Sequence, residues 1–135
     1  MIYTKEDKLK HLEFIQNIVT RMASNSFILK GWSITLTSVI IGFALNSSNK
    51  KLIYLAFIPT IIFWGLDAYY LRQEKLFREL YHAVAKNDKK IPNFSLNTDL
   101  VKEKVSDWFF VAWSVNLMSI HLTMILLLII ISNFN

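Results

Sequence analysis

About twenty apolar residues begin the stretch from Leu52 to Lys86, and a charged helical pattern continues directly from them. An apolar helix of that length can cross a hydrocarbon layer of roughly 30 Å. Because no glycine or proline interrupts the charged part, the stretch predicts one rod that leaves a bilayer and enters water. Pro59 lies inside the apolar part, where its missing N–H predicts a kink. The other elements have to pack beside this rod, in lipid or in the adjoining aqueous layer.

Two further apolar runs accompany this one. The predicted spans cover residues 27–45, 52–71 and 108–131. The hydrophobic content of 53% and the mean hydropathy of +0.35 exceed what a soluble domain of 135 residues usually carries. We therefore predict an all-α integral membrane protein with three transmembrane helices, folded as a single membrane domain over residues 1–135.

Basic residues are divided unequally between the two ends of these spans. Five precede or begin the first span, eight lie between the second and third, and only Lys50 and Lys51 lie in the link between the first and second. Because lysine and arginine concentrate in cytoplasmic segments, this predicts a cytoplasmic N-terminus and an outer C-terminus in a bacterial inner membrane. The formal charge of +5 favours contact with anionic lipid. Interleaved acidic residues and the lack of a known reading motif argue against nucleic acid as a partner.

The segments outside the spans carry helical patterns of their own. Residues 4–25 predict an amphipathic cytoplasmic helix, and residues 72–86 extend the second span into the cytoplasm. A polar corner at residues 23–26 is expected to separate the N-terminal helix from the first span. Residues 98–107 predict the cytoplasmic start of the third helix. The apolar stripe of the N-terminal helix could be buried by lipid or by the other cytoplasmic helices, and the pattern leaves both open.

Asp67 is the most informative polar residue of the spans. A charged carboxylate costs on the order of 2.5 to 3.5 kcal/mol at the centre of a span and less near its ends, so Asp67 should have a partner. Lys30 lies at a matching depth in the first span, and we predict that the two residues pair across the hairpin. The pair either gates an ion path or fixes the helix register. Asn116 and His121 of the third span are further pore or gate candidates, although an imidazole bonded to a neighbouring helix is a simpler explanation of His121.

Two surfaces are candidates for contacts with other chains. Small residues recur at spacings of four, three and four along the first span, which lets another helix approach closely. They predict a packing and oligomer face formed by Gly31, Thr35, Ser38 and Gly42. On the cytoplasmic extension of the second helix, an exposed stripe provides candidates for binding a partner protein: Phe77, Arg78, Tyr81 and His82.

The sequence lacks the motifs of common catalytic and cofactor sites. It contains no Walker loop, Rossmann fingerprint, zinc-binding histidine pair or nucleophile elbow. The three glycines lie inside the predicted spans, so no glycine-rich loop can hold phosphate, and the sequence has no cysteine. We therefore expect no enzyme activity, no cofactor and no metal site.

The segments RMASNSFILKGW and FWGLDAYYLRQEKLFRELY, together with the helix, hairpin and protruding second helix, carry a resemblance that covers roughly residues 4 to 86. The chain resembles the SLATT-type proteins, small bacterial membrane effectors of antiphage defence. The resemblance implies that an infection signal, either a partner protein or a nucleotide, rearranges the cytoplasmic helices and permeabilises or depolarises the inner membrane. The third long span departs from that family.

Three closely packed helices leave no channel between them, so conduction requires a homo-oligomer, for which we expect four or more chains. The alternative is a non-conducting membrane adaptor that recruits a soluble partner through its cytoplasmic helices. A small transporter is a third class, against which the lack of an internal repeat argues. His121→Leu separates the first two classes, because a pore should be sensitive to it and an adaptor should not.

Overall fold

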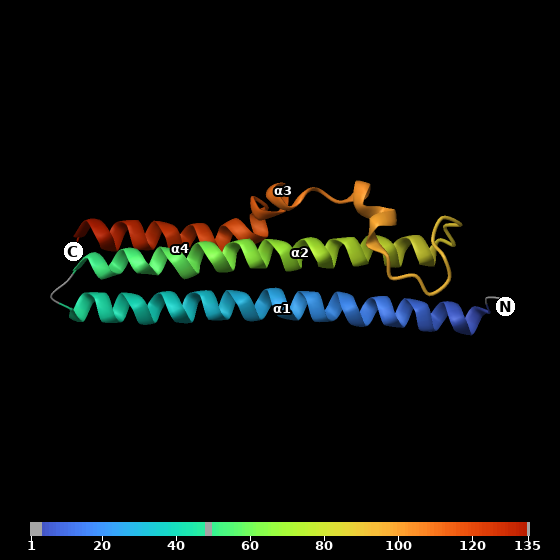
Figure 1. Ribbon diagram of the computed structural model, residues 1–135, viewed down its shortest axis with the longest axis horizontal. Coiled ribbons are helices and arrows are strands. Elements are labelled where there is room, and N and C mark those ends of the chain that lie inside the picture. The colour runs from blue at the N-terminus through green and yellow to red at the C-terminus, as the bar shows by residue number, and fades with distance from the viewer. Residues whose placement is uncertain (1–3, 48–49, 135) are drawn as a thin grey trace.

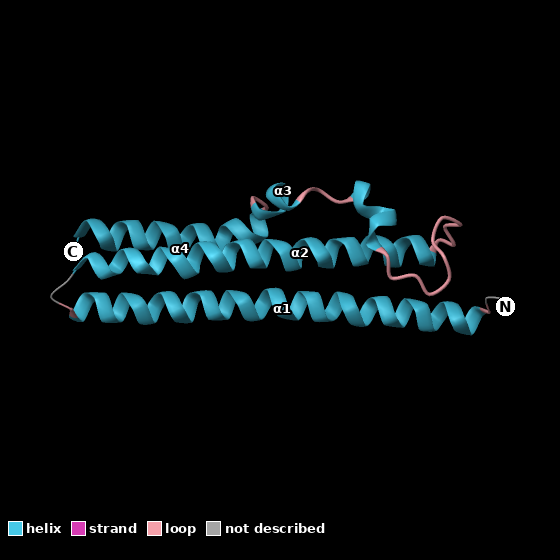
Figure 2. Cartoon of the chain, in the orientation of Figure 1, coloured by secondary structure: helices cyan, strands magenta, loops and turns pink. Residues whose placement is uncertain are grey.

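The computed structural model describes residues 4–47 and 50–134, which form helices joined by turns and loops and contain no strand (Figures 1 and 2). Two long helices dominate the molecule, α1 (Lys5–Asn46) and α2 (Phe57–Ala85). The remaining elements are shorter: the 3-10 helices η1 (Lys50–Ala56) and η2 (Thr98–Lys104), α3 (Trp108–Ala112) and α4 (Val115–Phe134). Three helical stretches are long and apolar enough to cross a membrane, within Lys5–Asn46, Lys51–Ala85 and Val115–Asn133.

α1 and α2 form an antiparallel pair, and α4 lies along one half of it (Figure 1). The half covered by α4 ends at the link between α1 and α2, which we call the hairpin end. The opposite end carries the start of α1 and the loop that follows α2, and we call it the N-terminal end. The bundle therefore has two parts along its length. Toward the N-terminal end is a two-helix layer, on which η2 and a loop pack, and toward the hairpin end is a three-helix layer that includes α4.

α1 is a single helix of 42 residues, about 63 Å long. It begins with a capping box, in which the Asp7 amide donates to Thr4 Oγ1 (3.1 Å) and the Thr4 amide donates to Asp7 Oδ2 (3.0 Å). The Thr4 amide, and the Thr4 hydroxyl that also donates to Asp7 Oδ2 (2.8 Å), lower the pKa of the Asp7 carboxyl below its ordinary value. The polar corner predicted at residues 23–26 is wrong. None of these residues is glycine or proline, and Ser26 is buried against α2, so the helix pairing continues through the corner.

One side of the N-terminal half of α1 packs on α2. Ile15 and Val19 are buried in one cluster with Leu80 and Val84 of α2. At the N-terminal end, Lys8 Nζ donates to the carbonyl oxygen of Ala85 (2.8 Å) and so caps the last turn of α2. The apolar stripe is therefore partly covered within the chain, while Leu9 and Phe14 stay exposed.

The kink predicted at Pro59 is also absent from its expected place. The segment predicted as the start of a continuous helix is instead the 3-10 helix η1, and α2 begins only at Phe57. Pro59 is thus the third residue of α2. At that position the backbone N–H has no partner within the helix, so proline removes no hydrogen bond.

The third helix is broken, whereas residues 98–131 were expected to form one continuous helix. Val101 is buried in the cluster that contains Leu80, and Trp108 Nε1 donates to the carbonyl oxygen of Gly65 (3.1 Å). These two docking points lie about 22 Å apart along α2, at the rise of an α-helix. Seven residues of α-helix rise only about 10 Å, so the chain has to be extended for part of the way. Val105 and Asp107 accordingly have extended backbone angles, and α4 starts only after a turn at Trp113 and Ser114.

Candidate functional site

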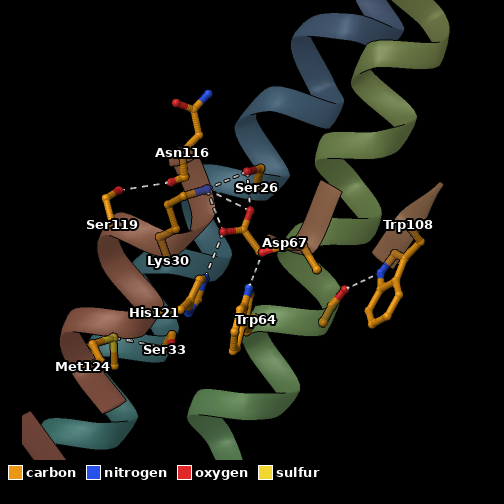
Figure 3. A network of polar contacts seen from close by, with 12 residues as sticks. Ser26, Lys30, Ser33, Trp64, Asp67, Trp108, Asn116, Ser119, His121 and Met124 are labelled. Atoms are coloured by element: carbon orange, nitrogen blue, oxygen red, sulfur yellow. Dashed lines mark hydrogen bonds and ion pairs between the residues drawn. The ribbon is translucent and has the colours of Figure 1, made fainter. Parts of the chain in front are cut away.

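Asp67 lies at the centre of a buried polar cluster in the three-helix layer (Figure 3). Its side chain is fully buried in α2. Lys30 of α1 contacts both carboxylate oxygens, with Nζ 2.7 Å from Oδ2 and 2.8 Å from Oδ1. The predicted pairing of Lys30 with Asp67 is therefore present.

Two further side chains complete the surroundings of this carboxylate. Ser26, one turn before Lys30 on α1, donates its hydroxyl to Asp67 Oδ1 and accepts a hydrogen bond from Lys30 Nζ (2.8 Å). From α4, His121 Nε2 lies 3.1 Å from Asp67 Oδ2, so its N–H donates to the carboxylate. One carboxylate thus joins all three long apolar helices. The sequence analysis missed both contacts. The spacing of four between Ser26 and Lys30 was the available signal for the first.

His121 packs against the aromatic side chain of Trp64. The Trp64 ring stacks on the imidazole, with centroids 6.2 Å apart and planes 13° from parallel. Trp64 Nε1 in turn donates to the carbonyl oxygen of Ala112 (2.9 Å), which fixes the end of α3. The second imidazole nitrogen, Nδ1, is buried and has no hydrogen-bond partner among the described residues. His121 therefore presents one satisfied and one unsatisfied nitrogen to the interior.

The polar cluster continues toward the hairpin end. Thr37 and Thr60 are both buried and their hydroxyl oxygens lie 2.9 Å apart, while the Thr60 hydroxyl also contacts the carbonyl oxygen of Ala56 (2.9 Å). Ser33 is fully buried between the two levels, with its hydroxyl 3.9 Å from the sulfur of Met124. We call the following residues, all of them buried except Lys30, the polar seam: Ser26, Lys30, Ser33, Thr37, Thr60, Asp67 and His121.

Spacing explains why the seam is continuous. Its four α1 residues follow one another at intervals of four, three and four, which places them on one face of a helix. Its two α2 residues are seven apart, two turns along one face. The outward surface of the same helices is rich in large apolar side chains, such as Phe43 and Ile61.

The pore and gate candidates are thus divided by the structure. Lys30, Asp67 and His121 meet in one cluster, whereas Asn116 is exposed on α4. Asn116 and His121 thus lie on different faces of α4. Five residues separate them, and at 100° per residue this turns Asn116 away from the face that carries His121.

The small-residue face on α1 points away from α2. Its four residues are exposed, and a Cβ atom added to Gly31 or Gly42 would meet nothing within 4 Å. The face that α1 presents to α2 is instead the one that carries Ser33 and Thr37. The predicted packing face is therefore not used within the chain.

The predicted exposed stripe for partner binding is partly wrong. Phe77 and Tyr81 are partly buried against the cluster that contains Ile15 and Leu80, because α1 covers this side of α2. Arg78 and His82 are exposed, and Arg78 pairs with Glu74 one turn earlier (Nε to Oε1, 2.8 Å). The aromatic residues thus serve the helix pair itself.

The chemistry available at the seam is that of charge and protons. It combines a carboxylate, an ammonium group, an imidazole and hydroxyls. Within residues 4–47 and 50–134, no group of three or more histidine, aspartate or glutamate side chains could hold a metal ion. Comparisons with protein-family models, with curated proteins and with solved structures found no match to this chain.

Proposed function

We propose that this chain is an oligomeric effector of bacterial antiphage defence that depolarises or permeabilises the inner membrane when triggered. Its three apolar helices cross the membrane with the N-terminus in the cytoplasm and the C-terminus outside. The N-terminal half of α1 and the C-terminal half of α2 lie in the cytoplasm, where they receive the signal. A partner protein or a nucleotide supplies that signal.

The unused small-residue face of α1 carries this proposal. Gly31, Thr35, Ser38 and Gly42 are exposed in a segment of apolar helix that faces lipid in the proposed topology. In lipid, helices associate mainly through close packing, and small residues allow their backbones to approach. A second copy of the chain can therefore dock on this face without rearranging the chain's own helix packing.

The polar cluster around Asp67 gives the proposed effector a resting state. Lys30 and Ser26 tie α1 to α2, and His121 ties α4 to the same carboxylate. Because α1 and α2 are continuous from the cytoplasm into the membrane, a movement of their cytoplasmic halves is transmitted to this cluster. Activation then consists of a movement of the three helices that this cluster joins, within an assembled ring.

The adaptor hypothesis has less surface available to it. Phe77 and Tyr81 are partly buried in the helix pair, so an adaptor would have to use exposed groups such as Arg78 and His82. Charge reversal at these two residues tests it, because an adaptor should lose its partner while the membrane assembly remains.

Depolarisation in living bacteria tests the main proposal. Cells that express the chain are challenged with phage and followed with a potential-sensitive dye and by growth. We expect depolarisation and growth arrest, both lost in Gly42→Leu, whose side chain would block close packing on the small-residue face. Phe43→Trp, which enlarges an exposed side chain outside that face, is the matched control and should retain both effects. Unchanged membrane potential under challenge and on strong expression would contradict the proposal.

A further inference from the structure

The polar seam occupies only part of the three-helix layer. Counted along α2, Asp67 lies about 10 Å closer to the N-terminal end than Thr60 does. Lys30 is the one seam residue among those at the Asp67 level whose side chain is partly exposed, at 19%. The seam therefore opens toward water at the cytoplasmic side of the proposed topology and runs inward to the Thr37–Thr60 pair.

Beyond Thr60 the interior changes character completely. Four apolar side chains, each 1% exposed or less, fill the space at the hairpin end: Ala44, Ile53, Ala56 and Leu128. Further apolar side chains pack around them, among them Ile40, Leu52 and Phe57. We call the four buried residues the apolar plug. A polar seam thus ends against a dry barrier within the same bundle.

We propose that the polar seam is the inner half of a proton path through the interior of each chain of the assembly, and that the apolar plug is its gate. A proton relay needs no open channel, so it can run between three closely packed helices. This inference rests on the proposed function and names the ion that carries the depolarising current. The groups that point to it are the buried carboxylate, the buried imidazole with one unsatisfied nitrogen, and the hydroxyl pair next in line.

Protons fit this interior better than hydrated ions do. Asp67 is enclosed at hydrogen-bond distance by Ser26, Lys30 and His121, and each of these contacts is 3.1 Å or shorter. A hydrated ion would have to displace these groups, whereas a proton moves between groups that are already in contact. Chains of buried acidic residues and histidines serve as proton relays in membrane proteins.

The central transfer is from His121 to Asp67. A proton that arrives at Nδ1 through the opened plug makes the imidazole a cation. The Nε2–H bond then breaks, the nitrogen keeps the electron pair, and an O–H bond forms at Asp67 Oδ2, which leaves a neutral imidazole and a carboxylic acid. Asp67 gives this proton to cytoplasmic water beside Lys30, whose ammonium charge restores the carboxylate. The imidazole now carries its proton on Nδ1; reorientation of the side chain turns this N–H toward Asp67, and the next proton adds to Nε2.

A gain-of-function variant tests the path without the natural trigger. Leu128→Ser places a hydroxyl in the plug, and the purified full chain is reconstituted in vesicles that contain a pH-sensitive dye and are energised by a potassium gradient with valinomycin. We expect proton flux above that of the wild-type chain, and its loss in Leu128→Ser combined with Asp67→Asn or with Thr60→Val. Ile130→Ser, on the exposed face of α4, is the matched control and should not raise the flux.

Two controls show whether a missing flux results from misfolding. Helix content and elution volume of each variant show whether it is folded, and Ile53→Thr opens the plug with a smaller change in volume. If both plug variants are folded and neither shows proton flux above that of the wild-type chain, the proposed path is overturned. Flux that persists unchanged in the double variants overturns it as well.

Potassium flux without the ionophore separates this inference from the proposed function. If the assembled chain leaks potassium or dye, and this leakage is unchanged in Asp67→Asn and Thr60→Val, the chain is still a membrane effector but the proton path is contradicted. No leakage of any solute, in vesicles or in challenged cells, would contradict both.

Discussion

The middle of the α1–α2 pair buries a charged cluster that the half toward the N-terminal end lacks among its described residues. Toward the N-terminal end the helices meet through Ile15, Val19 and Leu80, whereas toward the hairpin end they meet first through Lys30 and Asp67. The same two helices run through both halves without a break. The difference fits the proposed topology, in which the first half lies in water and the second in lipid. Apolar burial drives association in water, and in lipid hydrogen bonds and close packing take its place.

The largest effect is expected where the buried carboxylate loses its cation. Lys30→Met leaves the buried Asp67 carboxylate with only Ser26 and His121 as hydrogen-bond partners, which should lower the free energy of unfolding by about 3–5 kcal/mol. Reversible denaturation in mixed detergent micelles measures it. Arg78→Met breaks an exposed pair with Glu74 and should change stability by less than about 1 kcal/mol. Equal effects at the two sites would remove the distinction between the halves.

A compensating double variant sharpens the same comparison. Lys30→Met combined with Asp67→Leu removes the charge pair altogether, so no unpaired charge remains buried. Replacing a buried ion pair by apolar side chains is often neutral, and most of the stability lost in Lys30→Met should return. A double variant as unstable as Lys30→Met alone would show that packing, not charge, causes the loss.

A single methylene group should matter in the apolar half. Ile15 is fully buried, and Ile15→Val should cost about 1 kcal/mol in the same denaturation assay. Leu9→Val, at a half-exposed position of the same helix, is the control and should have a negligible effect. If both variants unfold like the wild type, the N-terminal half of α1 is not packed as the structure has it.

The hydroxyl pair of the polar half should contribute less. Thr37→Val removes its bond to Thr60, while Thr60 keeps its contact with the Ala56 carbonyl oxygen. Interhelical hydrogen bonds in membrane proteins are worth about 0.6 kcal/mol on average. A double-mutant cycle with Thr60→Val isolates this energy, and a coupling near zero would mean that the two hydroxyls do not bond across the helices.

The smallest effect is a pH dependence at the start of α1. The capping bonds lower the pKa of Asp7 in the folded state, so its contribution is present above the ordinary carboxyl pKa and is lost as the pH falls through the folded value. The protection factors of the first-turn amides, which are exchange rates corrected for the intrinsic pH dependence, should therefore fall in acid. The variant Asp7→Asn should show lower protection already at neutral pH and no such acid step. Protection factors in the wild type that do not change with pH would contradict the capping box.

Local rules account for much of what the sequence predicted. The three apolar runs mark the helices that are long enough to cross a membrane. Lys30 could be matched with Asp67 because a charge in an apolar run needs a partner, and depth along a hairpin can be counted from the link. The unused face of α1 could be listed from spacing alone, but not its direction relative to α2.

Contacts that depend on helix rotation or on distances between docking points could not be predicted. The imidazole of His121 reaches Asp67 only because α4 turns that face inward, and Asn116 therefore faces out. The break before α4 follows from the distance between the docking points of Val101 and Trp108 on α2. Phe77 looked exposed because the partner that covers it, α1, is far away in the sequence.

The number of chains in the membrane assembly tests the central claim most directly. We would measure the mass of the protein embedded in lipid nanodiscs, with the lipid and scaffold contributions subtracted. A closed assembly of four or more chains, reduced to smaller species by Gly42→Leu and unchanged by Phe43→Trp, is the predicted result. A monomer or dimer that persists in native lipid would contradict the proposed effector.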